Sequence, residues 1–298
     1  MNHDHNHEIE SYNRSFAIGV ILNIAFVVIE VGYGVFADSL ALIADAWHNL
    51  SDVISLLLAW GASLLAAKPS TENRTYGFRK TTILASLISA LLLLFALGAI
   101  TWEAIARFQH PRPVEGLTVI VVAMIGVLIN TITALLFFRG QKHDLNIRGA
   151  FLHMAADAGI SLGVAVAGVI IIFTGWMWID PVISFVIVAV IFIGTWGLLR
   201  DSTYYVLDFV PGRIDIKGIQ NYLLDIETVQ SIHDLHIWPL STTETALTVH
   251  LVVNEDSLDN AFLVDVAQHL HDHFDIGHST IQVEASTKES KCKLRSNC

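Results

Sequence analysis

The chain has 298 residues, of which 53% are hydrophobic and only 15% are charged, and its formal net charge is −11 at pH 7. A soluble protein carries closer to ~25% charged residues, so this composition excludes an ordinary soluble protein and indicates a membrane protein with a polar part. Residues 201–298 hold 15 acidic and 6 basic side chains. We therefore expect an acidic soluble domain at the C-terminal end, whose charge does not suit nucleic acid or an anionic membrane face as a partner.

Six apolar runs precede this domain, and each approaches or exceeds the ~20 residues that a helix needs to cross a lipid bilayer. We place the helices at residues 16–35, 40–67, 81–106, 117–138, 147–173 and 181–199. The connections after the second and fourth helices are rich in Lys and Arg, whereas the first and fifth connections have neither. Basic connections stay in the cytoplasm, so we expect both chain termini there.

Two of these runs carry the same motif, a His followed four residues later by an Asp. His48 and Asp52 lie in the second run, and His153 and Asp157 lie in the fifth. Residues four apart share one helix face, and ionisable groups inside a membrane helix usually mark a functional site. The alternative is a pair of buried structural contacts, but two copies in two membrane helices argue against it.

Two helices that face each other would bring these two imidazoles and two carboxylates together. A closed set of two nitrogen and two oxygen donors suits Zn²⁺, and the carboxylates balance the charge of the dehydrated cation. Zinc requires neutral imidazole, so metal and protons compete for the same site. The motif therefore predicts a membrane transporter that exchanges zinc for protons by alternating access.

Several other polar residues lie in or beside the helices. We expect Asn23, Glu30 and Asp45 to form hydrogen bonds between helices or to line the wall of the ion path. Asp38 and Asp180 lie in the first and fifth connections, where they suit helix caps. In particular, Asp180 followed by Pro181 predicts the start of the last membrane helix.

The acidic C-terminal region reads as a small α+β domain. Its expected elements are a helix at 214–224, strands at 231–238 and 245–253, a helix at 261–274 and a strand at 279–285. This order predicts a two-layer domain with its helices on one face of the sheet. The full prediction is a His-rich tail (residues 1–12), a six-helix transmembrane domain (13–206), the cytoplasmic domain (207–286) and a C-terminal tail (287–298).

A second metal site is expected on the open face of this sheet. Strand alternation turns His236, His250 and Glu284 away from the core, although a solvated surface is an equal alternative. The only cysteines, Cys292 and Cys298, are tail residues that could join the site. They indicate no disulfide framework, which fits a reducing compartment. The histidines of the first eight residues form either a metal-collecting arm or a disordered tail.

These motifs resemble the cation diffusion facilitator family, and specifically its zinc-transporting members. The resemblance is carried by residues 39–42 (SLAL), residues 45–52 (DAWHNLSD), His153 with Asp157, Asp180-Pro181, residues 235–238 (LHIW) and residues 280–284 (TIQVE). It implies a homodimer with six transmembrane helices per protomer, a cytoplasmic domain like a metallochaperone, and zinc/proton exchange. In the family, His at the first motif position accompanies zinc preference, so His48 favours zinc over a broader set of metals.

The chain also departs from patterns found in some members. Residues 68–80 contain no His, so we expect no metal site in that loop. Gln282 stands where some members have a His, so we expect a reduced metal site in the cytoplasmic domain rather than a two-metal cluster. Lys80 and Asp208 match a pair that ties protomers together in some members, and they suit a link between protomers or within the linker. Bacterial origin, and hence the inner membrane, is favoured by the short fourth connection.

Two rival functions remain at this point. An intramembrane metalloenzyme would also use zinc held by His and an acid, but the chain has no His-Glu-x-x-His motif. A metal-sensing regulatory protein would give the working role to the cytoplasmic domain and would leave the His/Asp motifs unexplained.

Overall fold

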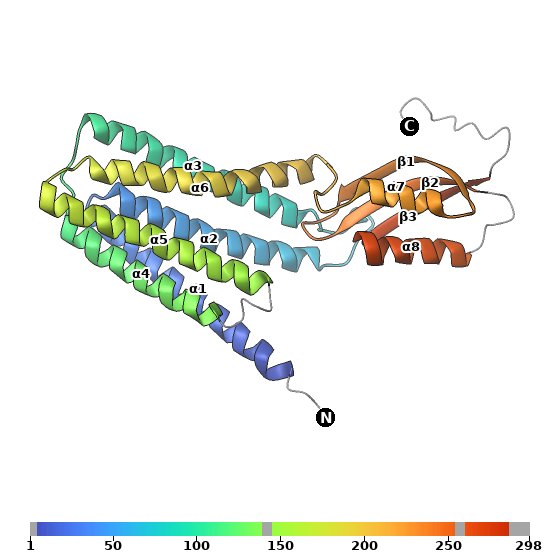
Figure 1. The fold of residues 1–298 in the computed structure, drawn as a ribbon, viewed down its shortest axis with the longest axis horizontal. Coiled ribbons are helices and arrows are strands. Elements are labelled where there is room, and N and C mark those ends of the chain that lie inside the picture. Colours follow the sequence, from blue (N-terminus) through green and yellow to red (C-terminus); the bar gives the residue numbers. More distant parts are fainter. Residues whose placement is uncertain (1–4, 139–144, 254–259, 286–298) are drawn as a thin grey trace. The chain divides into compact units, whose positions relative to one another are not determined.

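The structure, a computed structural model, describes residues 5–138, 145–253 and 260–285. The chain divides into two compact units. One comprises Met1–Leu58 with Ile88–Leu198, and the other comprises Ala59–Leu87 with Leu199–Cys298. The described secondary-structure elements of the first are all helices, and the second contains the sheet (Figure 1).

Six long helices come first along the chain. They are α1 (His5–Phe36), α2 (Leu40–Ala66), α3 (Thr81–Gln109), α4 (Gly116–Phe138), α5 (Leu145–Thr174) and α6 (Ile179–Val206). Within the described residues, α2 to α6 are long and apolar enough to cross a membrane, and α1 contributes the shorter apolar stretch Ile21–Phe36. The expected boundaries agree to within a few residues, except that α1 begins well before the expected start at residue 16 and α6 ends at Val206 rather than at residue 199.

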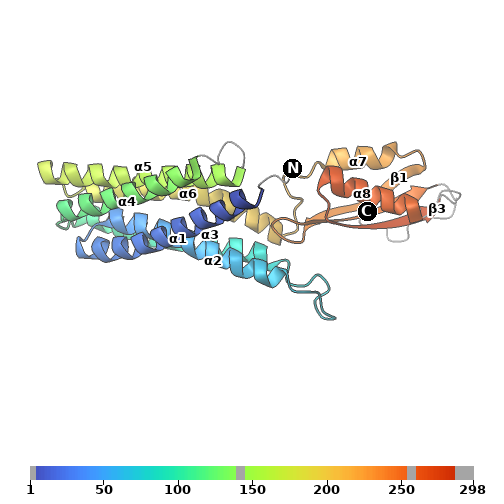
Figure 2. The ribbon, with the colours of Figure 1, turned by 90° about the horizontal axis from the view of Figure 1, so that it is seen from below.

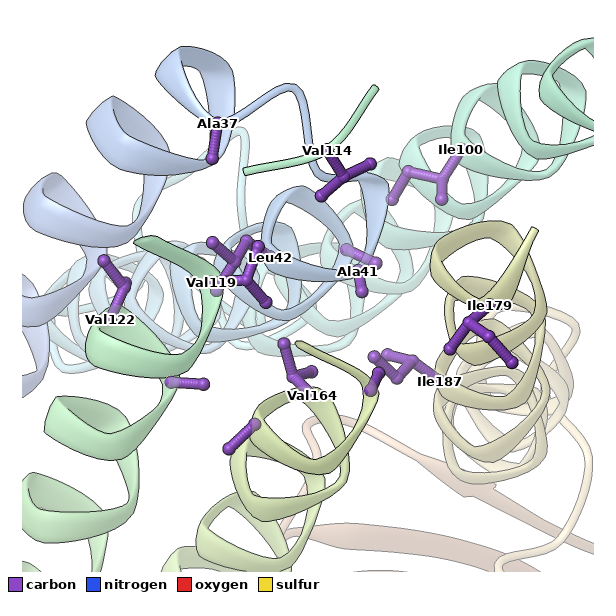
Figure 3. Close-up of a cluster of buried hydrophobic side chains, with 14 of the residues drawn as sticks. Ala37, Ala41, Leu42, Ile100, Val114, Val119, Val122, Val164, Ile179 and Ile187 are labelled. Carbon is purple, nitrogen blue, oxygen red and sulfur yellow. The ribbon is translucent and has the colours of Figure 1, made fainter. Parts of the chain in front are cut away.

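Apolar side chains from these helices meet in one buried cluster (Figure 3). Leu42 and Val164 lie in it without exposed surface, and they come from α2 and α5, the two helices with the His/Asp motifs. Both motif helices therefore contribute to the same buried core.

A reciprocal glycine contact brings α4 and α5 close together. A Cβ atom at Gly168 would lie 3.1 Å from the carbonyl oxygen of Gly116, and a Cβ at Gly116 would lie 3.1 Å from that of Gly168. Small residues allow membrane helices this close approach. The neighbouring helix thus fixes the position of α5 in the bundle.

The start of α2 is capped by a residue from the start of α6. The carboxylate of Asp180 accepts hydrogen bonds from Ser39 Oγ at 2.5 Å and from the Leu40 amide at 2.8 Å. The Ala41 amide donates to the same carboxylate at 3.3 Å. Asp180 was predicted to be a helix cap, and the helix that it caps is α2 rather than α6, in whose first turn it lies. Helix N-termini leave unpaired N–H groups that a carboxylate satisfies well.

The second unit contains α7 (Ile216–Asp225), β1 (Val229–Pro239), β2 (Thr245–Val253), α8 (Asn260–Phe274) and β3 (His278–Ala285). The strands form one sheet in the order β1-β2-β3, with β2 antiparallel to β1 and parallel to β3. Both helices cover the same face of the sheet (Figure 2). The predicted α-β-β-α-β order, and with it the predicted fold class, is confirmed.

Strand alternation divides the residues of β2 between the two faces of this sheet. Leu247, Val249, Leu251 and Val253 are fully buried under the helices, whereas His250 is only partly buried on the opposite face. The helix-free face therefore displays the polar side chains.

Candidate metal sites

The candidate site in the helical unit takes one His and one Asp from each of two helices. On α2, Nδ1 of His48 lies 3.8 Å from Oδ2 of Asp52. On α5, Nε2 of His153 lies 3.6 Å from Oδ2 of Asp157. In both helices the four-residue spacing places the imidazole and the carboxylate on the same face.

Shorter contacts cross between the two helices. Nε2 of His48 lies 3.3 Å from Oδ1 of Asp157, and Nε2 of His153 lies 3.1 Å from Oδ2 of Asp52. The two imidazole rings stand edge to face with centroids 5.9 Å apart. Ligand atoms of His48, Asp52 and Asp157 all lie within 4.8 Å of one another. The four residues that the sequence singled out are thus neighbours in the structure.

This group is buried on one side and accessible on the other. The Asp157 side chain is 1% exposed, whereas that of His153 is 43% exposed. Nδ1 of His48 and Oδ2 of Asp157 are buried and have no hydrogen-bond partner among the described residues. Buried polar atoms are normally paired, so these two atoms are suited to a bound cation that is reached from the accessible side.

A second layer of polar side chains lies behind this group. Asn49 Nδ2 donates a hydrogen bond to Glu30 Oε2 at 3.2 Å, and Ser161 Oγ donates one to Asp45 Oδ2 at 2.9 Å. These bonds join α1 to α2 and α2 to α5, one of the two roles predicted for Glu30 and Asp45. Asn23 on α1 contacts Met154 on α5, with Nδ2 3.4 Å from the sulfur.

The helix-free face of the sheet carries a separate group of possible metal ligands. Oε1 of Glu284 lies 3.4 Å from His233 Nε2 and 3.2 Å from His250 Nδ1. The two imidazole centroids are 5.0 Å apart, and the ligand atoms of all three residues lie within 4.8 Å of one another. Each side chain is partly buried, so this face has the geometry of a small three-ligand site.

His236 does not belong to this group, which corrects the prediction from the sequence. Its side chain is 63% exposed, and its Nε2 lies 2.8 Å from Asp234 Oδ1. His233 pairs with His250 and His236 pairs with Thr248, so one extra residue of β1 fits between the two pairs. Uninterrupted alternation would have turned His233 toward the core, whereas this β-bulge turns it outward.

Asp234 in the bulge connects His236 to the edge of the site. Its backbone is left-handed, with φ of 52°, a conformation that Asp tolerates better than most residues. The other oxygen of its carboxylate, Oδ2, lies 3.5 Å from His250 Nε2. A hydrogen bond to the His236 ring, helped by the charges of the nearby histidines, holds the pKa of the Asp234 carboxyl below its usual value.

The remaining candidates occupy different places. Lys80 Nζ and Asp208 Oδ1 form a salt bridge of 2.7 Å between two half-exposed side chains of the same chain. Cys292 and Cys298 lie outside the described residues, as does His3 of the N-terminal group. Residues 68–80, which contain no His, provide no three-residue metal group among the described side chains.

Comparison with known proteins covers almost the whole chain. The family model of the cation efflux transmembrane domain matches residues 16–207, and that of the cation efflux protein cytoplasmic domain matches residues 211–286. The boundary between the two matches lies at the end of α6.

Three bacterial relatives illustrate the similarity. A cadmium, cobalt and zinc/H(+)-K(+) antiporter of Bacillus velezensis is 36% identical, over 96% of this chain and 93% of that protein. The metal cation efflux system protein CzcD of Cupriavidus metallidurans is 38% identical, over 97% and 92%. The zinc transporter ZitB of Escherichia coli is 34% identical, over 95% and 93%. With both family models and these relatives aligned along nearly its full length, the chain belongs to the cation efflux family of membrane transporters.

Proposed function

We propose that this chain exports Zn²⁺ from the cytoplasm in exchange for protons, using His48, Asp52, His153 and Asp157 as the transport site. The observation that carries the proposal is the reciprocal pairing of these residues across α2 and α5, at 3.3 and 3.1 Å. Two imidazoles and two carboxylates match the ligands and the coordination number that zinc prefers. The names of the relatives, which include zinc transporters and an antiporter for zinc and protons, support the same cargo.

The coupling to protons follows from the donor atoms. An imidazole titrates near pH 6.5 in water, and only its neutral form binds zinc. Protons and zinc therefore displace each other from His48 and His153. If the site loads zinc on one side of the membrane and takes up protons on the other, the proton gradient drives export. Tilting of α2 and α5 would change which side is open.

Orientation and assembly form part of the proposal. The basic connections after α2 and α4 favour a cytoplasmic location for both termini, in a bacterial inner membrane. The match to a cytoplasmic domain whose model is named for dimerisation supports a homodimer. We further propose that His233, His250 and Glu284 bind a regulatory zinc ion on this domain, where the acidic surface attracts cations.

The experiment is a proton-flux assay in proteoliposomes that contain an internal pH dye. Addition of zinc should change the internal pH with wild-type protein and should have no effect with Asp157→Ala. The control is Asn130→Leu, which replaces a fully buried polar residue on α4 that is outside the proposed site. Equal zinc-dependent flux in wild type and Asp157→Ala would refute the proposed transport site, and zinc binding without flux in wild type would refute antiport.

A further inference from the structure

The helical unit contains a second pair of acidic residues that the proposed transport site does not use. Glu30 on α1 and Asp45 on α2 are both fully buried. Asp45 precedes His48 by almost one helical turn, toward the end of the bundle where α1 ends and α2 begins. Two carboxylates in an apolar interior require a compensating positive charge or a proton.

The hydrogen bonds around this pair account for only half of its oxygen atoms. Asn49 donates to Oε2 of Glu30, and Ser161 donates to Oδ2 of Asp45. The other oxygens, Glu30 Oε1 and Asp45 Oδ1, are buried and receive no hydrogen bond from the described residues. Asp45 and Asn49 are four residues apart and share one face of α2, so the hydrogen bond from Asn49 places the Glu30 carboxyl group beside that of Asp45. Ionised carboxylates only accept hydrogen bonds, so this contact requires a shared cation.

A proton fits this contact better than a metal ion does. Hard metal ions take about six or more oxygen ligands, whereas the nearest neighbours here direct an amide N–H and a hydroxyl O–H at the pair. One proton bound between two neighbouring carboxyl groups removes one buried negative charge and supplies the O–H donor that the pair lacks. The charged groups that act on the pair are His48 and Asp157; α4, which packs against α1, has no titratable side chain.

We infer that Glu30 and Asp45 share one proton and form a proton site that is separate from the metal ligands. This site releases its proton to water when Zn²⁺ enters the transport site. The inference rests on the proposed function. A divalent cation one turn away repels the shared proton in a medium of low dielectric constant. The proton leaves as the hydrated ion and the pair becomes a dicarboxylate, whose added negative charge is balanced by the nearby metal. Departure of the metal reverses both steps.

The test counts the protons that are released for each zinc ion bound. Titration calorimetry of the full chain in detergent, repeated in buffers of different ionisation enthalpy, gives this number. Wild type should release about one proton more per zinc than either Glu30→Gln or Asp45→Asn, because neither variant retains the pair. Asn130→Leu, the matched buried-polar control, should release as many protons as wild type. Equal counts in wild type and both pair variants would overturn the inference.

Infrared difference spectroscopy of the wild-type protein tests the inference without any substitution. Zinc should remove a carbonyl band of a protonated carboxylic acid, and the absence of this loss would overturn the inference even if both variants fail to fold. Failure of the proposed function would give a different result: wild-type protein would bind zinc no better than Asp157→Ala does. Normal zinc binding together with equal proton counts in wild type and both pair variants would reject only the shared-proton site.

Discussion

Nε2 of His48 on α2 lies 3.3 Å from Oδ1 of Asp157 on α5, although 109 residues separate them in the chain. The contact is one of two that link α2 and α5 through a nitrogen and an oxygen. A change in either atom should therefore change the preference of the site for particular metal ions.

His48→Asp replaces an imidazole nitrogen by a harder carboxylate oxygen. We expect zinc affinity to fall about tenfold or more, while affinity for Mn²⁺ falls less or rises, because oxygen ligands suit harder cations. Competition titrations of the two metals with detergent-solubilised protein would measure the ratio. An unchanged ratio of zinc to manganese affinity would show that His48 does not contact the metal.

The bulge in β1 predicts that His233, and not His236, binds zinc on the helix-free face of the sheet. In an Asp157→Ala background, which weakens the transport site, His233→Ala should remove the zinc ion bound by the cytoplasmic domain. His236→Ala should leave it bound, because the His236 ring contacts Asp234 rather than Glu284. Equilibrium dialysis with radioactive zinc would give the stoichiometry of each variant. Loss of zinc in His236→Ala alone would restore the assignment made from the sequence.

The carboxylate of Asp234 should make a pH-dependent contribution to the stability of the unit that contains the sheet. Because its pKa is lowered in the folded state, its ionised form stabilises the fold above the unfolded-state pKa of about 3.9. This contribution is lost as the pH falls through the lower, folded-state pKa. Denaturant unfolding of the full chain should show a difference between wild type and Asp234→Asn at pH 5 that decreases by pH 3. A difference that grows on acidification would contradict this account.

The close approach of α4 and α5 gives a matched pair of substitutions. Gly168→Ala places a methyl group 2.8 Å from Ile120 Cγ1 and 3.1 Å from the Gly116 carbonyl oxygen. Such overpacking typically costs ~1–3 kcal/mol, so the unfolding temperature in detergent should fall. Gly163→Ala on the same helix meets nothing within 4 Å, so it should be neutral or stabilising by up to ~1 kcal/mol. Equal effects of the two variants on the unfolding temperature would mean that α4 and α5 are not held together at Gly116 and Gly168.

The sequence could identify the transport-site candidates because their signal is local. His48 and Asp52 stand out in an apolar run, and their spacing alone places them on one helix face. The partner of each residue across the helix interface could not be predicted, because it depends on how α2 and α5 pack. The position of α5 depends in turn on its close contact with α4 at small residues such as Gly116, whose importance is visible only when another backbone lies against them.

The misassigned residue in the sheet has a different cause. Periodicity of two predicts the outward residues of β2 correctly, including His250, but it assumes that no residue is inserted in β1. One extra residue near Asp234 reverses the direction of the side chains just before it, including His233, as far as a second register shift between Val229 and Ser231. The sequence predicts Asp180 as a cap but could not predict which helix it caps, since Asp180 acts on a helix 140 residues earlier in the chain.

This cap limits the way in which α2 can move. The Leu40 and Ala41 amides and the Ser39 hydroxyl are all tied to the first turn of α6, so their separation from it would leave buried N–H groups unpaired. A motion of α2 that keeps these bonds must be a rotation of the helix about its first turn at Leu40. Its displacement then grows along the helix, so Asp52 travels farther than His48 and Ala66 farther still, and the site widens first at the end remote from the cap.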